Sequence, residues 1–174
     1  MPGAGKTSAC QFLVEKGFSV LRFGDQTDIG LHELDLPLTE ENERMYREKI
    51  RNELGMAAYA IKIKPRIEKV LPDNEKIALD GLYSWEEFIY LKKYFPDLIL
   101  LCIYARPDVR HKRLDKRKVR GLSLEMAKKR DYAEVEKLNK GGPIAIADYL
   151  VINNGSVKEF EKSMTRFLNF LNSR

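Results

Sequence analysis

Met1-Pro-Gly-Ala-Gly-Lys-Thr-Ser8 is the stretch that decides the fold of this 174-residue chain. It holds most of the phosphate-binding loop pattern G-x-x-x-x-G-K-[ST]. Small residues let the backbone curl around an anion, and the N-terminus of a following helix adds partial positive charge. We therefore expect nucleotide phosphates to contact the whole loop, namely Gly3, Ala4, Gly5, Lys6, Thr7 and Ser8.

Two side chains of the loop have predicted roles in the chemistry of a bound nucleotide. Lys6 would reach the β- and γ-phosphates, and the hydroxyl of Thr7 would bind Mg²⁺. The sequence that follows supports the motif, because an amphipathic helix is predicted for residues 7–16 and a strand for residues 18–23. The alternative is a flexible glycine-rich terminus. The strand that normally feeds such a loop would precede Met1, so we expect the first strand to be missing from this chain.

Length and composition narrow the class of protein. A chain of 174 residues is long enough for a single α/β domain over residues 1–174. The apolar run 98–105 is too short to span a membrane, and the N-terminus lacks the features of a secretion signal. Cys10 and Cys102 lie in apolar patterns, which favours reduced thiols over a disulfide. We therefore expect a cytoplasmic protein with no membrane partner.

Two acidic residues end predicted strands. Asp25 follows the strand 18–23, and Asp80 ends a short apolar run at 75–80. The carboxyl ends of parallel strands face the ligand crevice in open α/β sheets. Asp80 therefore fits the Walker B carboxylate that binds Mg²⁺, usually through water. Asp25 would bind or deprotonate the phosphoryl acceptor, and an Asp that only caps the next turn is the alternative.

Two segments between the predicted strands would enclose the substrates. Residues 26–71 begin polar and turn-rich, continue as helices over 40–54 and 56–70, and occupy the place of an acceptor-binding insertion. Residues 106–120 contain eight basic and two acidic side chains, which points to an anion that needs neutralising. With the polar helix that follows, they predict a mobile lid over residues 106–140. Nucleic acid is the rival partner, but few aromatic residues interleave with this charge, so we do not expect it.

A family resemblance covers nearly the whole chain. The pieces that carry it are Gly3-Ala-Gly-Lys-Thr7, Gly24-Asp25, Asp80-Gly81, Arg113-Leu-x-x-Arg117, Ala147-Asp148-Tyr-Leu-Val-Ile-Asn153 and Gly155-Ser156. Together they resemble dephospho-CoA kinase and the adenylate-kinase-like nucleotide kinases, and among them a poorly characterised group of small microbial kinase-like proteins. The resemblance implies an α/β P-loop NTPase fold. This fold is a three-layer sandwich with a parallel sheet of order 2-3-1-4-5, whose first strand is missing here, and a lid.

The resemblance also implies roles for individual residues. Asp25 would be the carboxylate on the acceptor side, and Arg117 a lid arginine on the phosphates. The loop that contains Asn153 and Gly155 would lie near the adenine of ATP. The arginine that nucleoside monophosphate kinases place shortly after the position of Asp25 is absent, so the acceptor stays open.

We predict an enzyme, a kinase that uses ATP and Mg²⁺ to phosphorylate a small acceptor such as a nucleoside monophosphate or a dephospho-CoA-like molecule. The catalytic residues would be Lys6, Asp25, Arg113 and Arg117, and the metal residues Thr7 and Asp80. A nucleotide-binding regulatory protein with little turnover and a nucleic-acid-associated NTPase remain open as other functions. The activity of a form without the first strand is open as well.

Overall fold

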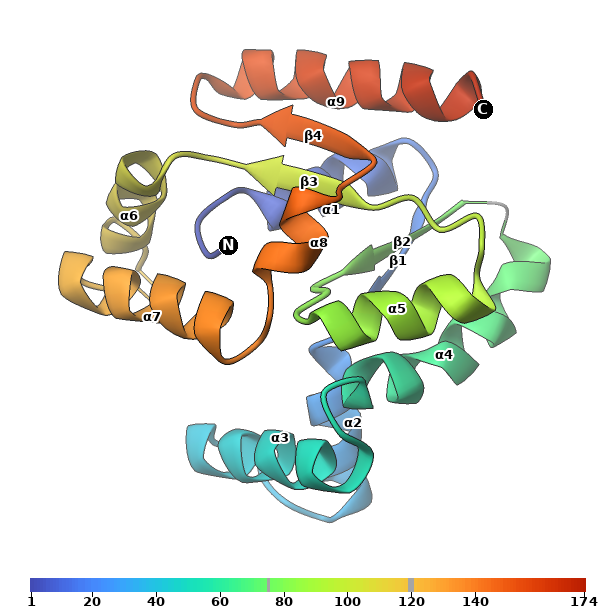
Figure 1. The fold of residues 1–174 in the computed structure, drawn as a ribbon, viewed down its shortest axis with the longest axis vertical. Coiled ribbons are helices and arrows are strands. Elements are labelled where there is room, and N and C mark those ends of the chain that lie inside the picture. Colours follow the sequence, from blue (N-terminus) through green and yellow to red (C-terminus); the bar gives the residue numbers. More distant parts are fainter. Residues whose placement is uncertain (75, 119–120) are drawn as a thin grey trace. The chain divides into compact units, whose positions relative to one another are not determined.

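The computed structural model describes residues 1–74, 76–118 and 121–174 (Figure 1). The contacts among these residues divide them into two compact units. Unit 1 comprises Met1–Phe12 and Ile99–Arg174, and unit 2 comprises Leu13–Leu98. Each unit contains one pair of parallel strands. Helix α1 (Lys6–Glu15) begins in unit 1 and ends in unit 2.

Unit 2 is built on the strand pair β1 (Ser19–Arg22) and β2 (Ile77–Asp80). The strands are parallel and in register from Ser19 opposite Ile77 to Arg22 opposite Asp80. The other elements are α2 (Asp25–Glu33), α3 (Glu40–Leu54), α4 (Ala58–Val70), a 3₁₀ turn at Leu71–Asp73 and α5 (Trp85–Tyr94). The parallel register places the carboxyl ends of both strands side by side.

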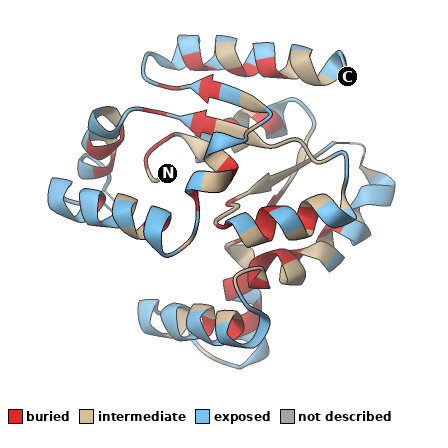
Figure 2. Ribbon diagram, in the orientation of Figure 1, coloured by how far each residue is buried: buried red, intermediate tan, exposed pale blue. Residues whose placement is uncertain are grey.

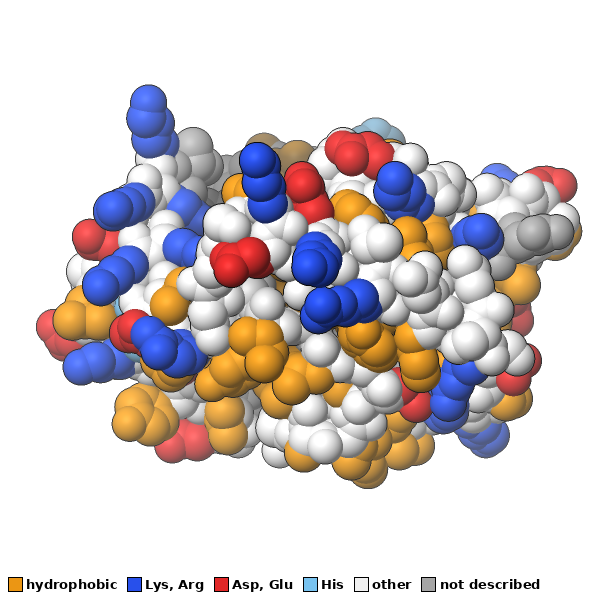
Figure 3. Space-filling model, turned by 90° about the horizontal axis from the view of Figure 1, so that it is seen from above, with side chains coloured by type: hydrophobic (Ala, Val, Ile, Leu, Met, Phe, Trp, Pro, Cys, Tyr) orange, Lys and Arg blue, Asp and Glu red, His pale blue; other side chains and the backbone are white. Residues whose placement is uncertain are grey.

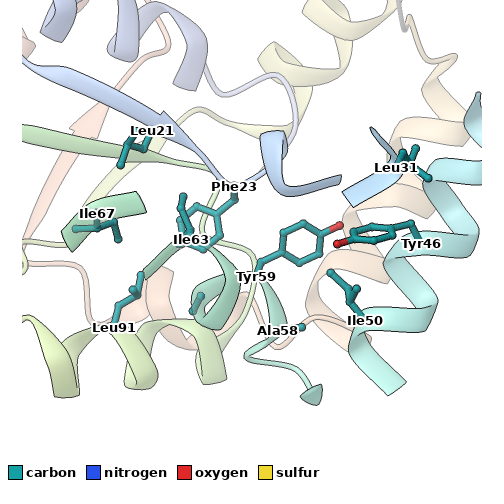
Figure 4. Packing of buried hydrophobic residues seen from close by; sticks show 11 residues of the cluster. Leu21, Phe23, Leu31, Tyr46, Ile50, Ala58, Tyr59, Ile63, Ile67 and Leu91 are labelled. Carbon is teal, nitrogen blue, oxygen red and sulfur yellow. The ribbon is translucent and has the colours of Figure 1, made fainter. Parts of the chain in front are cut away.

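Buried apolar side chains from β1 and from helices α2 to α5 form the core of unit 2 (Figure 4). Phe23, Leu31 and Ile63 are fully buried in it. Burial of a large apolar side chain stabilises a fold by about 1.5–3 kcal/mol, so this cluster holds the four helices to the strand pair. The helical insertion predicted from the sequence therefore packs on the same core as the strands.

Local signals explain the helix ends that the sequence predicted. The hydroxyl of Thr39 accepts a hydrogen bond from the backbone N–H of Asn42 and caps α3. Ser84 and Glu87 form a capping box at the start of α5. Helix α3 therefore begins where the sequence predicted. Pro65, a residue type that disrupts helix interiors, lies inside α4, which continues because its flank is packed in the core.

Helix α2 corrects the prediction that residues 26–38 are turn-rich. Its buried side is made of polar or small residues, namely Gln26, Thr27 and Gly30, with Leu31 as the one large apolar member. The hydroxyl of Thr27 lies 2.7 Å from that of Tyr59 on α4. Polar contacts of this kind leave no apolar periodicity in the sequence, which is why the helix was not recognised.

Unit 1 is built on the parallel pair β3 (Leu101–Tyr104) and β4 (Tyr149–Ile152). Its helices besides the start of α1 are α6 (Pro107–Asp115), α7 (Leu124–Glu136), α8 (Gly141–Ala145) and α9 (Val157–Asn172). Helix α9 is amphipathic, with Phe160, Met164 and Phe167 buried. It packs on β4 with the Tyr149 and Phe167 ring centroids 5.3 Å apart.

In a sheet of order 2-3-1-4-5, strands 2 and 3 are neighbours on one side of the first strand, and strands 4 and 5 are neighbours on the other. Because the first strand is expected to be missing here, β1–β2 corresponds to the first of these pairs and β3–β4 to the second. The described residues form two separate two-stranded sheets, β1–β2 and β3–β4, in place of one continuous sheet. The full strand order and the lid remain predictions. Arg120, counted in the basic stretch, and Glu75, counted in a strand, lie outside the described residues.

The surface is rich in charge. Helices α3 and α7 are exposed along most of their length (Figure 2). On the face shown in Figure 3, Lys and Arg side chains are interspersed with acidic and hydrophobic ones. Over the described ranges, every helix is too short or too polar to cross a membrane.

A glycine inside α2 provides a test of the core of unit 2. A Cβ on Gly30 would overlap the Tyr46 ring of α3, which is buried. Gly30→Ala should therefore destabilise the protein by about 1–3 kcal/mol through overpacking, although alanine is ordinarily the better helix former. Gly24→Ala at the start of the same helix meets no atom within 4 Å and is the control. Equal thermal melting of the two variants would show that α2 does not pack on Tyr46.

Candidate active site

The predicted phosphate-binding loop turns sharply into α1. Gly3 and Gly5 have φ values of 73° and 105°, a region that favours glycine. Helix α1 starts at Lys6, and the N–H of Ala9 donates to the carbonyl oxygen of Gly5 at 3.0 Å to close its first turn. The N–H groups of that first turn have no carbonyl partner within the helix, so they can bind an anion.

Neighbouring residues leave no room for side chains on the two glycines. A Cβ on Gly3 would lie 2.8 Å from the carbonyl oxygen of Arg110, and one on Gly5 would overlap the side-chain amide of Asn153. Both positions therefore require glycine for space as well as for backbone conformation. Unit 1 thus holds the loop from two sides.

The side chains of the loop differ in their surroundings. The Nζ of Lys6 donates to the carbonyl oxygen of Met1 at 3.0 Å, so the ammonium lies back across the loop. Thr7 and Ser8 are exposed at the start of α1. Their hydroxyl groups can therefore be reached from outside.

Asn153, at the end of β4, supports the loop. Its Nδ2 donates to the carbonyl oxygen of Ala4 at 2.9 Å, and its Oδ1 accepts from the Nη2 of Arg113 at 3.4 Å. The sequence suggested a place near the adenine for Asn153 and Gly155, and that contact remains a prediction. Gly155 itself packs against the carboxylate of Glu159, which caps α9.

Arg113 carries a buried donor that the described residues leave without a partner. Its Nη1 has no hydrogen-bond acceptor among the residues that the structure describes. A buried unsatisfied donor costs about 1–3 kcal/mol. An anion or an acceptor atom next to Asn153 would remove this cost. Arg117 is exposed just after α6.

The two predicted acids lie together at the end of the β1–β2 pair. Arg22 reaches both, with its Nη1 4.0 Å from Asp25 Oδ1 and its Nε 3.8 Å from Asp80 Oδ2. The Nη2 of Arg66 on α4 lies 3.4 Å from Asp25 Oδ2. Both acids therefore lie where the paired strands β1 and β2 end, facing arginines that the sequence did not reveal, and their roles remain predictions.

An open pocket of about 210 Å³ lies within unit 2 between α2, α3 and α4. Its lining consists of Gln26, Ile29, Glu33, Tyr46, Lys62 and Arg66. When the Gln26 amide is oriented to satisfy its neighbours, its oxygen accepts from Arg66 Nη1 at 2.6 Å. Arg66 therefore faces both this pocket and Asp25.

A buried ion-pair cluster connects α6 with α7. Arg110 donates to both carboxylate oxygens of Asp131 at 2.8 Å, and the Nε2 of His111 lies 2.8 Å from the same carboxylate. Burial alone would raise the pKa of Asp131, but its hydrogen bonds to Arg110 and His111 outweigh this effect and lower the pKa. One turn later, Glu134 accepts from the buried ammonium of Lys140 at 2.5 Å.

Because the pKa of Asp131 is lowered in the folded protein, we predict that the protein loses stability at acid pH. A carboxyl group with a depressed pKa in the fold contributes stability above its unfolded pKa, about 3.9 for Asp, and loses it as the pH falls through its folded pKa. The free energy of unfolding should therefore decrease below about pH 4. Asp131→Asn should flatten this decrease more than Asp108→Asn, whose exposed pair with Arg106 is worth little. Denaturant titrations between pH 3 and 7 would measure it, and equal slopes would contradict it.

The residues present fit a nucleotide with Mg²⁺. The loop offers N–H groups, Lys6 and the partnerless Nη1 of Arg113 to phosphate oxygens. Thr7 in unit 1 and Asp80 in unit 2 each carry the kind of oxygen that Mg²⁺ prefers, a hydroxyl and a carboxylate, and this ion ordinarily takes few protein ligands and keeps several waters. No group of three or more His, Cys, Asp or Glu that could hold a metal was found in the described part of the chain.

Comparisons with known proteins identify the family of this chain. A family model described as an AAA domain matches residues 1–133. A UPF0200 protein of Sulfurisphaera tokodaii is 34% identical, with 97% of this chain and 92% of the relative covered. UPF0200 protein MJ1399 of Methanocaldococcus jannaschii is 33% identical, with 98% of this chain and 85% of the relative covered.

Solved structures resemble the whole chain in fold. TT1252 from Thermus thermophilus matches with a TM-score of 0.64 at 19% identity, and shikimate kinase from Bacteroides thetaiotaomicron with 0.60 at 15%. Each match covers 98% of this chain and 93% of the other. At this identity the likeness shows the fold alone, which is the α/β fold of P-loop kinases.

Proposed function

This chain belongs to the UPF0200 family and carries an AAA-type P-loop domain, and on that premise we propose that it is an ATP- and Mg²⁺-dependent phosphotransferase with a small acceptor. The observation that carries the proposal is the loop itself. Two glycines in left-handed conformations, with no room for a Cβ, lead directly into a helix N-terminus with Lys6 at its first position. A loop of this geometry favours phosphate binding.

The basic residues would act by position and charge. A bound ATP with its metal supplies the transferable phosphoryl group. Lys6 exchanges its bond to the Met1 carbonyl oxygen for the phosphate oxygens, and Arg113 donates its partnerless Nη1. Arg117 can close over the same oxygens from its exposed position. These donors stabilise charge that spreads over the phosphate oxygens in the transition state.

The motif positions of Thr7 and Asp80 are the basis for proposing them as metal ligands. The hydroxyl of Thr7 is exposed at the start of α1. The carboxylate of Asp80 has one long ion pair in the described residues, at 3.8 Å to Arg22, and this contact is weak enough to yield to a divalent cation. Both are hard oxygen donors, as Mg²⁺ requires.

Asp25 would contact the phosphoryl acceptor. Its carboxylate can accept a hydrogen bond from an acceptor hydroxyl and take its proton during transfer. Arg66 lies 3.4 Å from it and also lines the pocket of unit 2, where Lys62 adds a second cation. This arrangement fits an acceptor that carries an anionic group as well as a hydroxyl or phosphate nucleophile.

Transfer of radiolabelled γ-phosphate from ATP to a panel of acceptors tests the proposal. The panel holds nucleoside monophosphates, dephospho-CoA and uncharged polyols of similar size. We expect transfer to one anionic acceptor, reduced about 10²–10⁴-fold in Asp25→Asn because a general base is lost. Asp28→Asn, an exposed acid one turn along α2, is the control and should keep wild-type rates.

The outcomes separate the possible functions. ATP binding without transfer to any acceptor would favour a regulatory nucleotide-binding protein. Hydrolysis that depends on polynucleotide, with an affinity that falls steeply with salt, would favour a nucleic-acid-associated NTPase. Equal rates for Asp25→Asn and the wild type would remove Asp25 from the mechanism.

A further inference from the structure

We propose that the buried Arg110–Asp131 pair positions the phosphate-binding loop and couples helix α7 to nucleotide binding. This inference rests on the proposed function for the identity of the ligand, but the mechanical link lies within unit 1. Arg110 does not face the reacting atoms in this assignment. It acts through the backbone of the loop, which makes it a positioning residue.

Arg110 contacts the loop directly. Besides Asp131, its guanidinium donates to the carbonyl oxygen of Pro2 at 3.2 Å and to that of Ala105, at the end of β3, at 3.0 Å. Its own carbonyl oxygen is the atom that a Cβ on Gly3 would meet. The side chain is 5% exposed, so its position is fixed by these partners and not by water. A shift of Arg110 therefore shifts Pro2 and Gly3.

Helix α7 depends on polar contacts for its attachment. Ala127 and Glu134 are its buried residues in the described structure, and its larger apolar side chains Leu124, Tyr132 and Val135 are exposed. Asp131 joins it to α6, and Glu134 joins it to Lys140. An element with so little apolar burial belongs to the less stable part of a fold and can open while the rest stays folded. The bidentate pair is therefore one of the polar contacts that keep α7 attached, and it is the one whose arginine also contacts the loop.

Coupling of this kind works in both directions. If an attached α7 holds the loop in its anion-binding form, a nucleotide that binds this form must favour the attached α7 by the same factor. Nucleotide binding would therefore order α7 through Asp131, Arg110 and Pro2.

The chain provides a matched control pair. Arg106 and Asp108, also at the start of α6, form a bidentate pair at 3.1 and 2.9 Å. Their side chains are 61% and 53% exposed, and their hydrogen bonds within the described residues do not involve the loop. The two pairs share their chemistry and differ in burial and in the link to the loop.

Amide hydrogen exchange, with ATP titrations, tests the proposal on the full chain. Without nucleotide, Asp131→Asn should speed exchange about tenfold in the first turns of α1 and in α7, because charge-assisted hydrogen bonds are lost. Arg110→Lys keeps the positive charge but loses the paired hydrogen bonds of the guanidinium to Asp131, and it should behave in the same way. With Mg·ATP, both variants should bind about tenfold more weakly, and the wild type should show protection of α7 that both variants lack. Asp108→Asn should match the wild type throughout.

Three outcomes would distinguish failure of the coupling from failure of the proposed function. If Asp131→Asn and Arg110→Lys are folded and exchange in the α1 turn like Asp108→Asn, the pair is a structural contact of α7 only. If exchange changes as expected but the wild type binds no nucleotide, the coupling stands and the proposed function fails. If nucleotide binds all variants equally, the proposed function stands and the coupling fails.

Discussion

Lys6→Ala is expected to lower phosphoryl transfer by about 10³-fold, the upper end of the cost of removing one donor that stabilises transition-state charge. Lys6 is half-buried and donates to the carbonyl oxygen of Met1 in the nucleotide-free structure. Its loss therefore removes a charge from the phosphate site and no apolar core. Steady-state rates at saturating Mg·ATP would measure the effect.

The control for this variant is Lys16→Ala. Lys16 is exposed just beyond the other end of α1. It should keep wild-type turnover, and both variants should melt within a few degrees of the wild type, because neither change removes core. Near-normal turnover of folded Lys6→Ala would contradict the assignment of the phosphate-binding loop.

Gly5→Ala is expected to weaken nucleotide binding by about 100-fold or more, because φ strain of 1–3 kcal/mol and a steric overlap act together. The φ of Gly5 is 105°, and the new Cβ would overlap the Asn153 amide that holds the Ala4 carbonyl oxygen. The loop would have to move away from both α1 and Asn153.

Gly17→Ala is the matched control for this second variant. Gly17 also has a positive φ, 84°, but no atom lies within 4 Å of a Cβ placed there. It should cost stability through strain while nucleotide affinity stays unchanged. Calorimetric titration of ATP at a temperature where both variants are folded separates the two effects. Equal affinities would show that the geometry of Gly5 is not needed for binding.

Much of the fold follows from local signals in the sequence. Helix α3 was predicted over residues 40–54 and carries an N-cap at Thr39, and α5 and α9 begin with capping boxes, which are signals of the same local kind. Helix α2 was missed because the contacts that bury it come from α3 and α4 and leave no periodic signal. Strand ends were predicted within about three residues, since short apolar runs define them only loosely.

In the candidate site, too, some residues could be predicted from local sequence signals and others could not. The loop residues and the two acids follow from motifs, because a motif is a run of neighbours in the chain. Asn153, Arg110 and Arg66 act across 149, 108 and 41 positions on Ala4, Pro2 and Asp25. Nothing near them in the sequence indicates these partners, and folding alone brings them together. Arg110 was visible only as one of eight basic residues in a charged stretch.

Equilibrium titration of ATP, with and without Mg²⁺, is the most direct test of the account. The wild-type chain is expected to show saturable binding to one site, strengthened by Mg²⁺ and weakened, but still measurable, in Lys6→Ala. Circular dichroism on the same samples would establish that both proteins are folded. A folded wild-type chain without saturable binding up to millimolar ATP, or one that binds no better than Lys6→Ala, would contradict the account.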